Sequence, residues 1–333
     1  MEAFTKKTLQ TSRGYNYTYY TADGHGTLPT LFFQHGWPDH AAMWEGVAAS
    51  LISAKYPIII PDLLGYDGTD KPTDPAAYQW SGMTQDLVEI MDAEKASKVV
   101  SIGHDWGAAC ASRLYNYHAD RVVGVVLLNV AYTPPSRQPF DLVAVNQMME
   151  QTFGYPIISY WHLFTAPDGP ALLKANLGRL FNAMHSGPDV LKQLFTTKDG
   201  LRDYLVNGGG GVAPVQPRAY AQDAKFRQDF MHRFTRDGFE GPLCWYKATT
   251  QNDQYESDKS LPEGADTVHV PVLFMGAKDD AVCRHEAIQG PIKARLLPHL
   301  EQTDIIDAGH WVPYEQPEIV AENIKKWLSK HYA

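Results

Sequence analysis

The sequence has few cysteines for its length. Its 333 residues include only Cys110, Cys244 and Cys283, and no two of them have the CxxC spacing of a zinc ribbon. A disulfide framework or a zinc ribbon therefore cannot be the basis of the fold. Scarce cysteine favours a reducing compartment, so we expect a cytoplasmic protein.

Long apolar runs and excess positive charge are also missing. No stretch reaches the roughly 18 apolar residues that a membrane-spanning helix needs, and the first twenty residues lack the apolar core of a secretory signal. The formal net charge is −9, which argues against nucleic acid or an anionic membrane as the partner. No pattern indicates an oligomeric state, and an uncharged small-molecule substrate is compatible with this charge.

Short apolar strands alternate with helical stretches over the first 130 residues. The strand patterns end in LFFQHG, IIIPDLLG, VVSIGHDWG and VVLLNV, with helical patterns at 79–95 and 107–118. Residues 15–21, rich in Tyr and Thr, predict an edge strand. The alternation resumes in VPVLFMGAKDD and EQTDIIDAGH and closes with the amphipathic PEIVAENIKKWLSKH. This order predicts an α/β fold with a mostly parallel, twisted sheet flanked by helices.

Residues 134–262 interrupt this alternation. They combine helical stretches with many aromatics, scattered prolines and four consecutive glycines at 208–211. We expect residues 1–133 and 263–333 to form one core domain, with 134–262 inserted as a helical cap. The glycine run lacks the Lys-Ser/Thr of a phosphate loop, so we interpret it as a flexible loop.

The strongest motif is Gly103-His104-Asp105-Trp106-Gly107, between an apolar strand and a helix. It has the form of the G-x-S-x-G nucleophile elbow, with Asp105 in the serine position. The small residues on either side leave room for a strained turn that holds the central side chain exposed. The alternative is that Asp105 simply caps the following helix.

An aspartate at this turn changes the chemistry that is expected. A carboxylate is anionic at neutral pH and can displace a leaving group at saturated carbon. The product is an ester of Asp105, and water must then attack the ester carbonyl with the help of a base and an oxyanion hole. Asp105 thus predicts hydrolysis at saturated carbon and disfavours an ordinary esterase.

The base and its orienting acid are expected later in the chain. His310, in DAGHWVPYEQP, follows the last apolar strand and is the candidate base. Asp279 and Asp280 both follow the preceding strand, and either could orient the imidazole. The backbone N–H groups of Trp106 and of Trp37, in HGWP, are the candidate oxyanion hole.

Two more histidines lie close to these motifs in the sequence. His35 belongs to HGWP, and His104 precedes the nucleophile. We interpret both as packing or hydrogen-bonding residues around the turn, with a role as the base as the alternative.

Taken together, HGWPDH, PDLLGYDGTDKP, GHDWGA, GAKDD and GHWVPYEQP resemble the soluble epoxide hydrolases of the α/β-hydrolase superfamily, the fungal members being one candidate group. The motifs span residues 30–320 in the same order as in that family. The resemblance implies the α/β-hydrolase fold, an inserted cap and no metal or cofactor. It favours Asp279 over Asp280 as the acid, and it implies a cis peptide bond before Pro38.

The resemblance also implies two cap tyrosines that donate hydrogen bonds to the epoxide oxygen. One matches Tyr246 in a Trp-Tyr pair, and the other matches Tyr160 in SYWHLF, with Tyr155 in FGYP as the alternative. The physical need is a proton for an alkoxide leaving group, which phenols supply without charging the pocket. The expected substrate is therefore a small apolar epoxide, with water as the second reactant.

Several positions depart from the family pattern or are less specific. In the loop after the second apolar strand, Leu64, Asp67 and Thr69 stand where Arg, Gly and Ser are usual, and this loop is structural in the family. Four cap residues are candidates for lining the substrate pocket or, equally, for the cap core: Phe153, Trp161, Phe164 and Met184.

Two other functions are compatible with parts of this pattern. Haloalkane dehalogenases share the aspartate nucleophile and the following tryptophan, but a leaving halide needs N–H donors and no proton, so the tyrosine pair favours an epoxide. A ligand-binding protein that has lost turnover would not need the Asp105, His310 and aspartate set.

Overall fold

The protein is described here by a computed structural model that covers residues 1–25, 27–208 and 215–332. Most of the four-glycine run, for which we expected a flexible loop, lies outside the described residues. Within the described part of the chain, no helix combines the length and apolar character needed to cross a bilayer.

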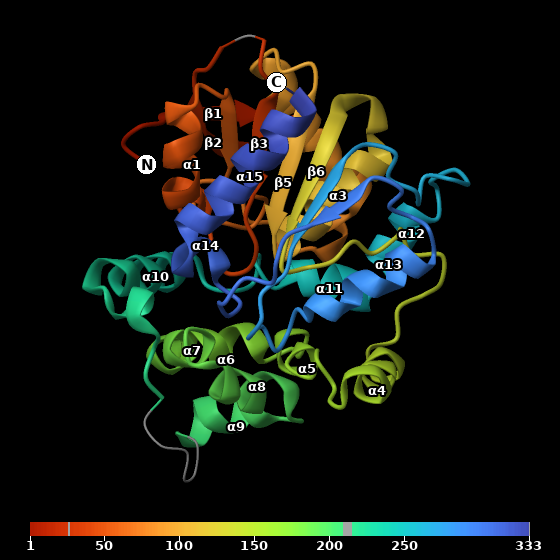
Figure 1. The fold of residues 1–333 in the computed structure, drawn as a ribbon. Helices are drawn as coiled ribbons and strands as arrows, with labels where there is room; N and C mark the ends of the chain where they lie inside the picture. Colours follow the sequence, from red (N-terminus) through yellow and green to blue (C-terminus); the bar gives the residue numbers. More distant parts are fainter. Residues whose placement is uncertain (26, 209–214, 333) are drawn as a thin grey trace.

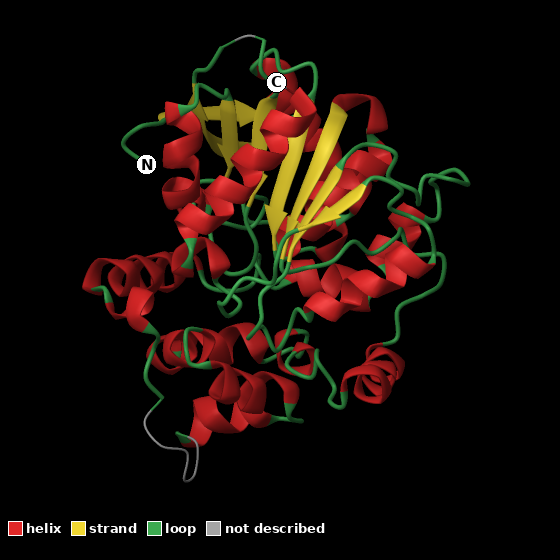
Figure 2. Ribbon diagram, viewed as in Figure 1, coloured by secondary structure: helices red, strands yellow, loops and turns green. Residues whose placement is uncertain are grey.

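An eight-stranded sheet runs through the centre of the core (Figures 1 and 2). Its order is β1-β2-β4-β3-β5-β6-β7-β8; the pairs β1·β2 and β2·β4 are antiparallel and the rest are parallel. The strands are β1 (Thr5–Gln10), β2 (Asn16–Ala22), β3 (Thr30–Gln34), β4 (Ile58–Pro61), β5 (Val99–His104), β6 (Val122–Leu128), β7 (Val272–Met275) and β8 (Leu300–Gln302). This confirms the mostly parallel sheet predicted from the alternating pattern.

The strand predicted at 15–21 is present as β2, but it is not an edge strand. Both of its sides are paired, with β1 on one side and β4 on the other. The edge is β1, which was not recognised because its side chains are exposed or half-buried and carry no apolar run.

Helices cover both faces of the sheet. The core helices are α1 (Glu45–Ser53), α2 (Trp80–Ala93), α3 (Trp106–Tyr117), α13 (Gln289–Lys293), α14 (Val312–Glu315) and α15 (Pro317–Tyr332). Alternate residues of β5 explain the two layers, because Val100 and Ile102 join the core packed under α1 and α15, whereas Val99 joins the core packed under α2 and α3.

A run of helices separates β6 from β7 and lies beyond the carboxyl ends of the parallel strands (Figure 1). These helices are α4 (Leu142–Phe153), α5 (Trp161–Phe164), α6 (Gly169–Ala175), α7 (Leu177–Met184), α8 (Pro188–Thr196), α9 (Gly200–Asn207), α10 (Ala224–Asp237), α11 (Cys244–Thr250) and α12 (Asp253–Asp258). The loops that follow β3, β5 and β7 open toward this layer, which is where sites gather in open parallel sheets. We refer to α4–α12 as the cap.

Candidate active site

The turn between β5 and α3 holds Asp105 in a strained backbone conformation. Its φ of 55° and ψ of −127° lie outside the regions that L-residues favour. A Cβ atom on Gly103 would collide with the backbone of Gly107, and one on Gly107 would collide with the carbonyl of Gln34 in β3. The two glycines therefore let the turn pack directly against the neighbouring strand.

Two backbone N–H groups converge on the Asp105 carboxylate. Trp37 N donates to Oδ1 at 2.9 Å, and the N–H of Trp106 also donates to this carboxylate. Burial raises the pKa of Asp105, while the positive charge of His310 and these two hydrogen bonds act in the opposite direction. The peptide between Trp37 and Pro38 is cis, as the resemblance implied.

His310 lies between two carboxylates. Its Nε2 is 3.7 Å from Oδ2 of Asp105, and its Nδ1 is 2.8 Å from Oδ2 of Asp280. Burial alone would lower the pKa of His310, but the charge and hydrogen bond of Asp280, together with the charge of Asp105, raise it to about 9. Asp105, His310 and Asp280 are thus brought together in a single chain of contacts, the arrangement that a nucleophile, a base and an orienting acid would need.

Asp280, not Asp279, contacts His310, so the expectation that favoured Asp279 is wrong. The side chain of Asp279 is half-buried, and its backbone N–H donates to the carbonyl of Ala308. Asp280 is 1% exposed, and its Oδ1 accepts hydrogen bonds from the backbone N–H groups of Val282 and Cys283. That turn points Oδ2 at the imidazole.

Asn129 is a neighbour of the site that we had not anticipated. It follows β6 with a φ of 63°, and its Nδ2 donates to Oδ2 of Asp280 at 2.6 Å. The only sign of Asn129 in the sequence is its position after an apolar strand. Asparagines at such positions are common because they tolerate the left-handed backbone conformation, so the position alone does not indicate a role in the site.

His35 and His104 act as buried hydrogen-bonding residues around the turn, as expected. His35 Nδ1 donates to the carbonyl of Gly36, while its Nε2 accepts from Leu63 N at 2.9 Å. His104 Nε2 donates to the carbonyl of His310 at 2.7 Å. Burial lowers the pKa of both imidazoles to about 3, which keeps them neutral.

Tyr160 and Tyr246 line the same small cavity as Asp105. Tyr160 immediately precedes α5 and Tyr246 lies in α11, with ring centroids 6.1 Å apart and planes at 76°. Burial raises the pKa of each phenol well above 10, so both are neutral donors at physiological pH. The alternative, Tyr155, instead donates its hydroxyl hydrogen to the carbonyl of Ala281.

The cavity is lined by residues of both the core and the cap. They are Trp37, Asp105, Tyr160, Met184, Leu191, Phe195, Tyr246, Val282, His310 and Trp311. Of the four candidate pocket residues only Met184 is among them. Phe164 packs against Trp37, and Trp161 packs against Trp106, while Phe153 is half-buried at the end of α4. Those three therefore belong to the cap or its junction with the core.

The fold agrees with comparisons to known proteins. The sequence model of the family described as alpha/beta hydrolase fold matches residues 29–317. The chain belongs to this family. It is 28% identical to epoxide hydrolase A of Mycobacterium tuberculosis, over 92% of each chain. It is 26% identical to bifunctional epoxide hydrolase 2 of Rattus norvegicus over 91% of its own length, but spans only 52% of that relative.

Solved structures give the same fold. The crystal structure of epoxide hydrolase A from Mycobacterium thermoresistibile superimposes with a TM-score of 0.77 and 26% identity, and the match covers 98% of each chain. An epoxide hydrolase from an endophytic Streptomyces superimposes with a TM-score of 0.80 over 99% of this chain, at 22% identity.

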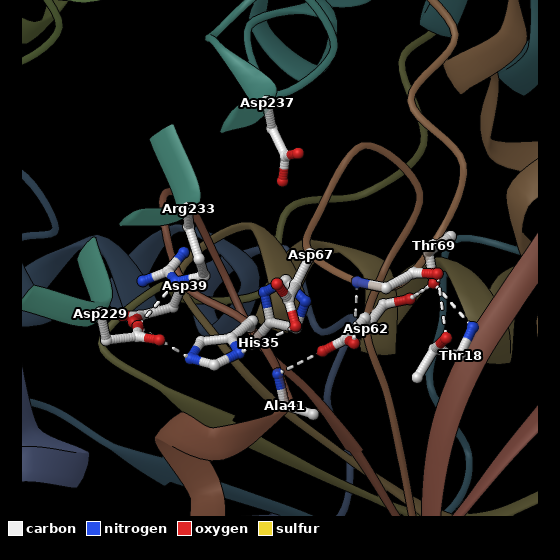
Figure 3. A network of polar contacts seen from close by, with 12 residues as sticks. Thr18, His35, Asp39, Ala41, Asp62, Asp67, Thr69, Asp229, Arg233 and Asp237 are labelled. Atoms are coloured by element: carbon white, nitrogen blue, oxygen red, sulfur yellow. Dashed lines mark hydrogen bonds and ion pairs between the residues drawn. The ribbon is translucent and has the colours of Figure 1, made fainter. Parts of the chain in front are cut away.

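The loop after β4, where this α/β-hydrolase departs from the pattern of epoxide hydrolases, is held by side chains (Figure 3). Asp62 Oδ1 accepts a hydrogen bond from Ala41 N at 2.8 Å. Thr69 Oγ1 donates to the carbonyl of Asp62 and accepts from Thr18 N. Thr69 thus makes one hydrogen bond within the loop and one that joins the loop to β2.

Two groups of side chains in the described part of the chain have ligand atoms close enough to suggest a metal. They are Asp105 with Cys283 and His310, and His40 with Asp62 and Asp67. In both groups the carboxylates already accept hydrogen bonds from protein donors, namely Trp37, Ala41 and Arg236.

Proposed function

We propose that this protein is an epoxide hydrolase that opens a small apolar epoxide to a vicinal diol through an ester of Asp105. The observation that supports this best is the shared cavity, in which a carboxylate nucleophile and His310 face two neutral phenols, Tyr160 and Tyr246. The two relatives described above are named as epoxide hydrolases, and each aligns with more than 90% of this chain. Their names support the same reaction.

In the first step Oδ2 of Asp105 attacks one epoxide carbon and breaks the ring C–O bond. The ring oxygen leaves as an alkoxide and takes a proton from Tyr160 or Tyr246, while the other phenol donates a hydrogen bond. Oδ1 stays hydrogen-bonded to the N–H of Trp37. The result is a hydroxyalkyl ester of Asp105 and one tyrosinate.

In the second step His310 removes a proton from water, and the hydroxide adds to the ester carbonyl. The charge of Asp105 has been lost, so one of the causes that raise the pKa of His310 is removed. The imidazolium then gives up its proton more readily, and the neutral imidazole, which can accept a proton from water, is more populated. The tetrahedral oxyanion is stabilised by the N–H groups of Trp37 and Trp106. Its collapse expels the alkoxide, which takes the proton of the newly added hydroxyl group and leaves as the diol, so that Asp105 is again a carboxylate. The proton on His310 then restores the tyrosine.

Haloalkane dehalogenation is the second candidate, and one observation favours it. The indole Nε1 of Trp37 is a buried donor without a hydrogen-bond partner among the described residues, and its side chain lines the cavity. Against it, Trp106 does not line the cavity, although a halide-binding indole would have to face the leaving group. Two phenols are also of little use to a halide, which leaves without a proton.

The test is to trap the ester. In a His310→Gln variant, incubation with styrene oxide should add the mass of one epoxide to the peptide that contains Asp105, and Asp105→Asn should abolish the adduct. The wild type should convert the same epoxide to its diol. Absence of an adduct and of diol with aromatic, alicyclic and fatty-acid epoxides would contradict the proposal. Halide release from 1-chlorobutane in the absence of diol formation would assign the dehalogenase reaction instead.

A further inference from the structure

A buried arginine of the cap, Arg233, is hydrogen-bonded to the loop that carries Trp37. Figure 3 shows this arginine beside Asp229. Arg233 lies on α10 and is 6% exposed, and its Nη1 donates to the carbonyl oxygen of Pro38 at 3.0 Å. Pro38 directly follows Trp37, whose N–H is bonded to the Asp105 carboxylate. A single residue of the cap is therefore hydrogen-bonded to the residue next to one oxyanion donor.

Ion pairs fix Arg233 at this position. Its Nε donates to Oδ2 of Asp229, one turn earlier on α10, at 2.7 Å. The same Asp229 oxygen lies 3.4 Å from Nε2 of His40, two residues after Pro38. A planar guanidinium with its Nε and Nη1 groups in hydrogen bonds is held in one orientation, unlike a flexible ammonium. Arg233 and Asp229 thus join α10 to the 38–40 segment at two places, Pro38 and His40.

Aromatic packing fixes the other side of the same loop. Phe239, just after α10, stacks on Phe234 at 4.3 Å and lies 6.2 Å from the ring of Trp37. Trp37 and Pro38 therefore contact the cap both through an aromatic ring and through a charged hydrogen bond. Neither Phe239 nor Arg233 contacts the reacting atoms, so any effect they have must act through the loop.

We propose that Arg233 is a positioning residue, which holds the Pro38 carbonyl so that the N–H of Trp37 points at the oxygen of the tetrahedral intermediate. This inference rests on the aspartyl-ester reaction proposed above. It gives the cap a part in the second chemical step, beyond covering the pocket and supplying phenols.

The two chemical steps should depend differently on this contact. Before the ester forms, the Trp37 N–H already donates to the anionic carboxylate of Asp105. The attack on the epoxide removes charge from this carboxylate, so weakening the hydrogen bond does not raise the barrier to ester formation. During ester hydrolysis negative charge returns to the same oxygen, and a misplaced donor loses the stabilisation that it supplies in the transition state. Loss of Arg233 should therefore slow hydrolysis of the ester and leave its formation largely unchanged.

The experiment is single-turnover kinetics on the full chain with styrene oxide. In Arg233→Gln, the rate of ester hydrolysis should fall about 10-fold, the size expected for a displaced donor rather than a deleted one. The rate of ester formation should stay within about 2-fold, and mass spectrometry should show the Asp105 ester accumulating during turnover. Arg233→Lys, which retains a charged donor, should recover part of the loss and serves as the readout if the glutamine variant does not fold.

Arg236 provides the matched control. It lies three residues later on α10 and donates to Oδ1 of Asp67 at 2.8 Å, so it also joins the cap to the core, but it has no hydrogen bond to the 37–40 segment. Arg236→Gln should leave the hydrolysis rate within about 2-fold of the wild type. Equal slowing in both glutamine variants would show a general effect of cap docking and overturn the proposal, as would normal ester hydrolysis in Arg233→Gln.

The outcome can be separated from a failure of the proposed function. If His310→Gln traps the ester while Arg233→Gln hydrolyses it normally, the reaction stands and the role of Arg233 is wrong. If His310→Gln forms no ester with any epoxide, the underlying reaction itself is wrong.

Discussion

Asp280 and His310 are joined by a hydrogen bond of 2.8 Å between Oδ2 and Nδ1. The other oxygen of Asp280 is occupied by two backbone N–H groups, and Asn129 donates to Oδ2 as well. The carboxylate is therefore held by four donors, and its pKa is lowered because, although burial opposes ionisation, the charge and hydrogen bond of His310 outweigh it. The imidazole has little freedom to rotate away from Asp105.

Replacing Asp280 should stop the reaction at the ester. In Asp280→Asn the amide can no longer stabilise the imidazolium or fix its tautomer, so we expect ester hydrolysis to slow by at least about 100-fold. Rapid-quench mass spectrometry of the Asp105 peptide measures this rate. Asp279→Asn is the control, since that side chain is half-buried and does not contact His310, and it should remain within about 2-fold of the wild type. Similar losses in the two variants would contradict the assignment of Asp280.

The phenols should govern the other chemical step. Tyr160→Phe and Tyr246→Phe each remove one proton donor from the cavity, and each should slow ester formation by roughly 10- to 100-fold, with a larger loss in the double variant. The rate of ester hydrolysis should change little in the single variants. Tyr155→Phe is the control, because its hydroxyl donates to the Ala281 carbonyl and the side chain does not line the cavity. Normal ester formation in the double variant would show that other groups protonate the oxygen.

Part of the site could be predicted from the sequence because its signals lie close together in the chain. Glycines two residues before and after Asp105 are a requirement of the turn itself, and His310 follows the last strand pattern, so both could be selected among many alternatives. The helices expected at 79–95 and 107–118 are present as α2 and α3. In each case the decisive information lies within about ten residues of chain.

The choice of acid and the pocket depended on three-dimensional packing instead. Asp279 and Asp280 are neighbours in sequence, and only the turn that bonds Asp280 Oδ1 to two N–H groups decides which one faces His310. The sequence also does not show which aromatic residues of the cap line the cavity. A cap helix can bury one side against the core and another side around the cavity, and both sides are apolar. Leu191 and Phe195, both on α8, line the cavity, although no motif distinguishes them from Phe153 on α4.

The close approach of the nucleophile turn to β3 predicts a strong effect on stability. A methyl group on Gly107 would meet the backbone carbonyls of Gln34 and His35, neither of which can move without disturbing the sheet. We expect Gly107→Ala to lower the free energy of unfolding by at least about 3 kcal/mol, the upper part of the usual range for overpacking. Urea denaturation followed by circular dichroism measures the difference.

Gly290 is a suitable control for that substitution. It lies in α13, and no heavy atom other than its chain neighbours and its own helix backbone is within 4 Å of the added Cβ position. Gly290→Ala should change the free energy of unfolding by less than about 1 kcal/mol, because the higher helix propensity of alanine and the steric restriction on a residue before Pro291 act in opposite directions. A neutral Gly107→Ala would mean that the turn does not pack as tightly against β3 as the geometry indicates.

His40 predicts a pH dependence of stability. Burial and the charge of Arg233 lower its pKa, but hydrogen bonds with Asp229 and Asp67 outweigh them and raise it to about 9. The ionisable groups around His40 come from the core and from α10, and they are His35, Asp39, Asp62, Asp67, Asp229 and Arg233. In the unfolded chain the pKa of histidine is about 6.5. The stabilisation from His40 is therefore fully present below pH 6.5 and is lost as the pH rises through about 9.

The comparison that isolates this effect is between the wild type and His40→Gln across that pH range. At pH 6 the variant should be less stable by about 3 kcal/mol, the value that a pKa rise of this size corresponds to, and the gap should shrink steadily as the pH approaches 10. Urea unfolding at intervals of one pH unit measures it. His162→Gln, at an exposed position on α5, should have little effect on stability and serves as the control. If the difference in free energy of unfolding between the wild type and His40→Gln widened at high pH, the imidazole would have to be neutral in the folded protein. Asp67 and Asp229 would then not be its ion-pair partners.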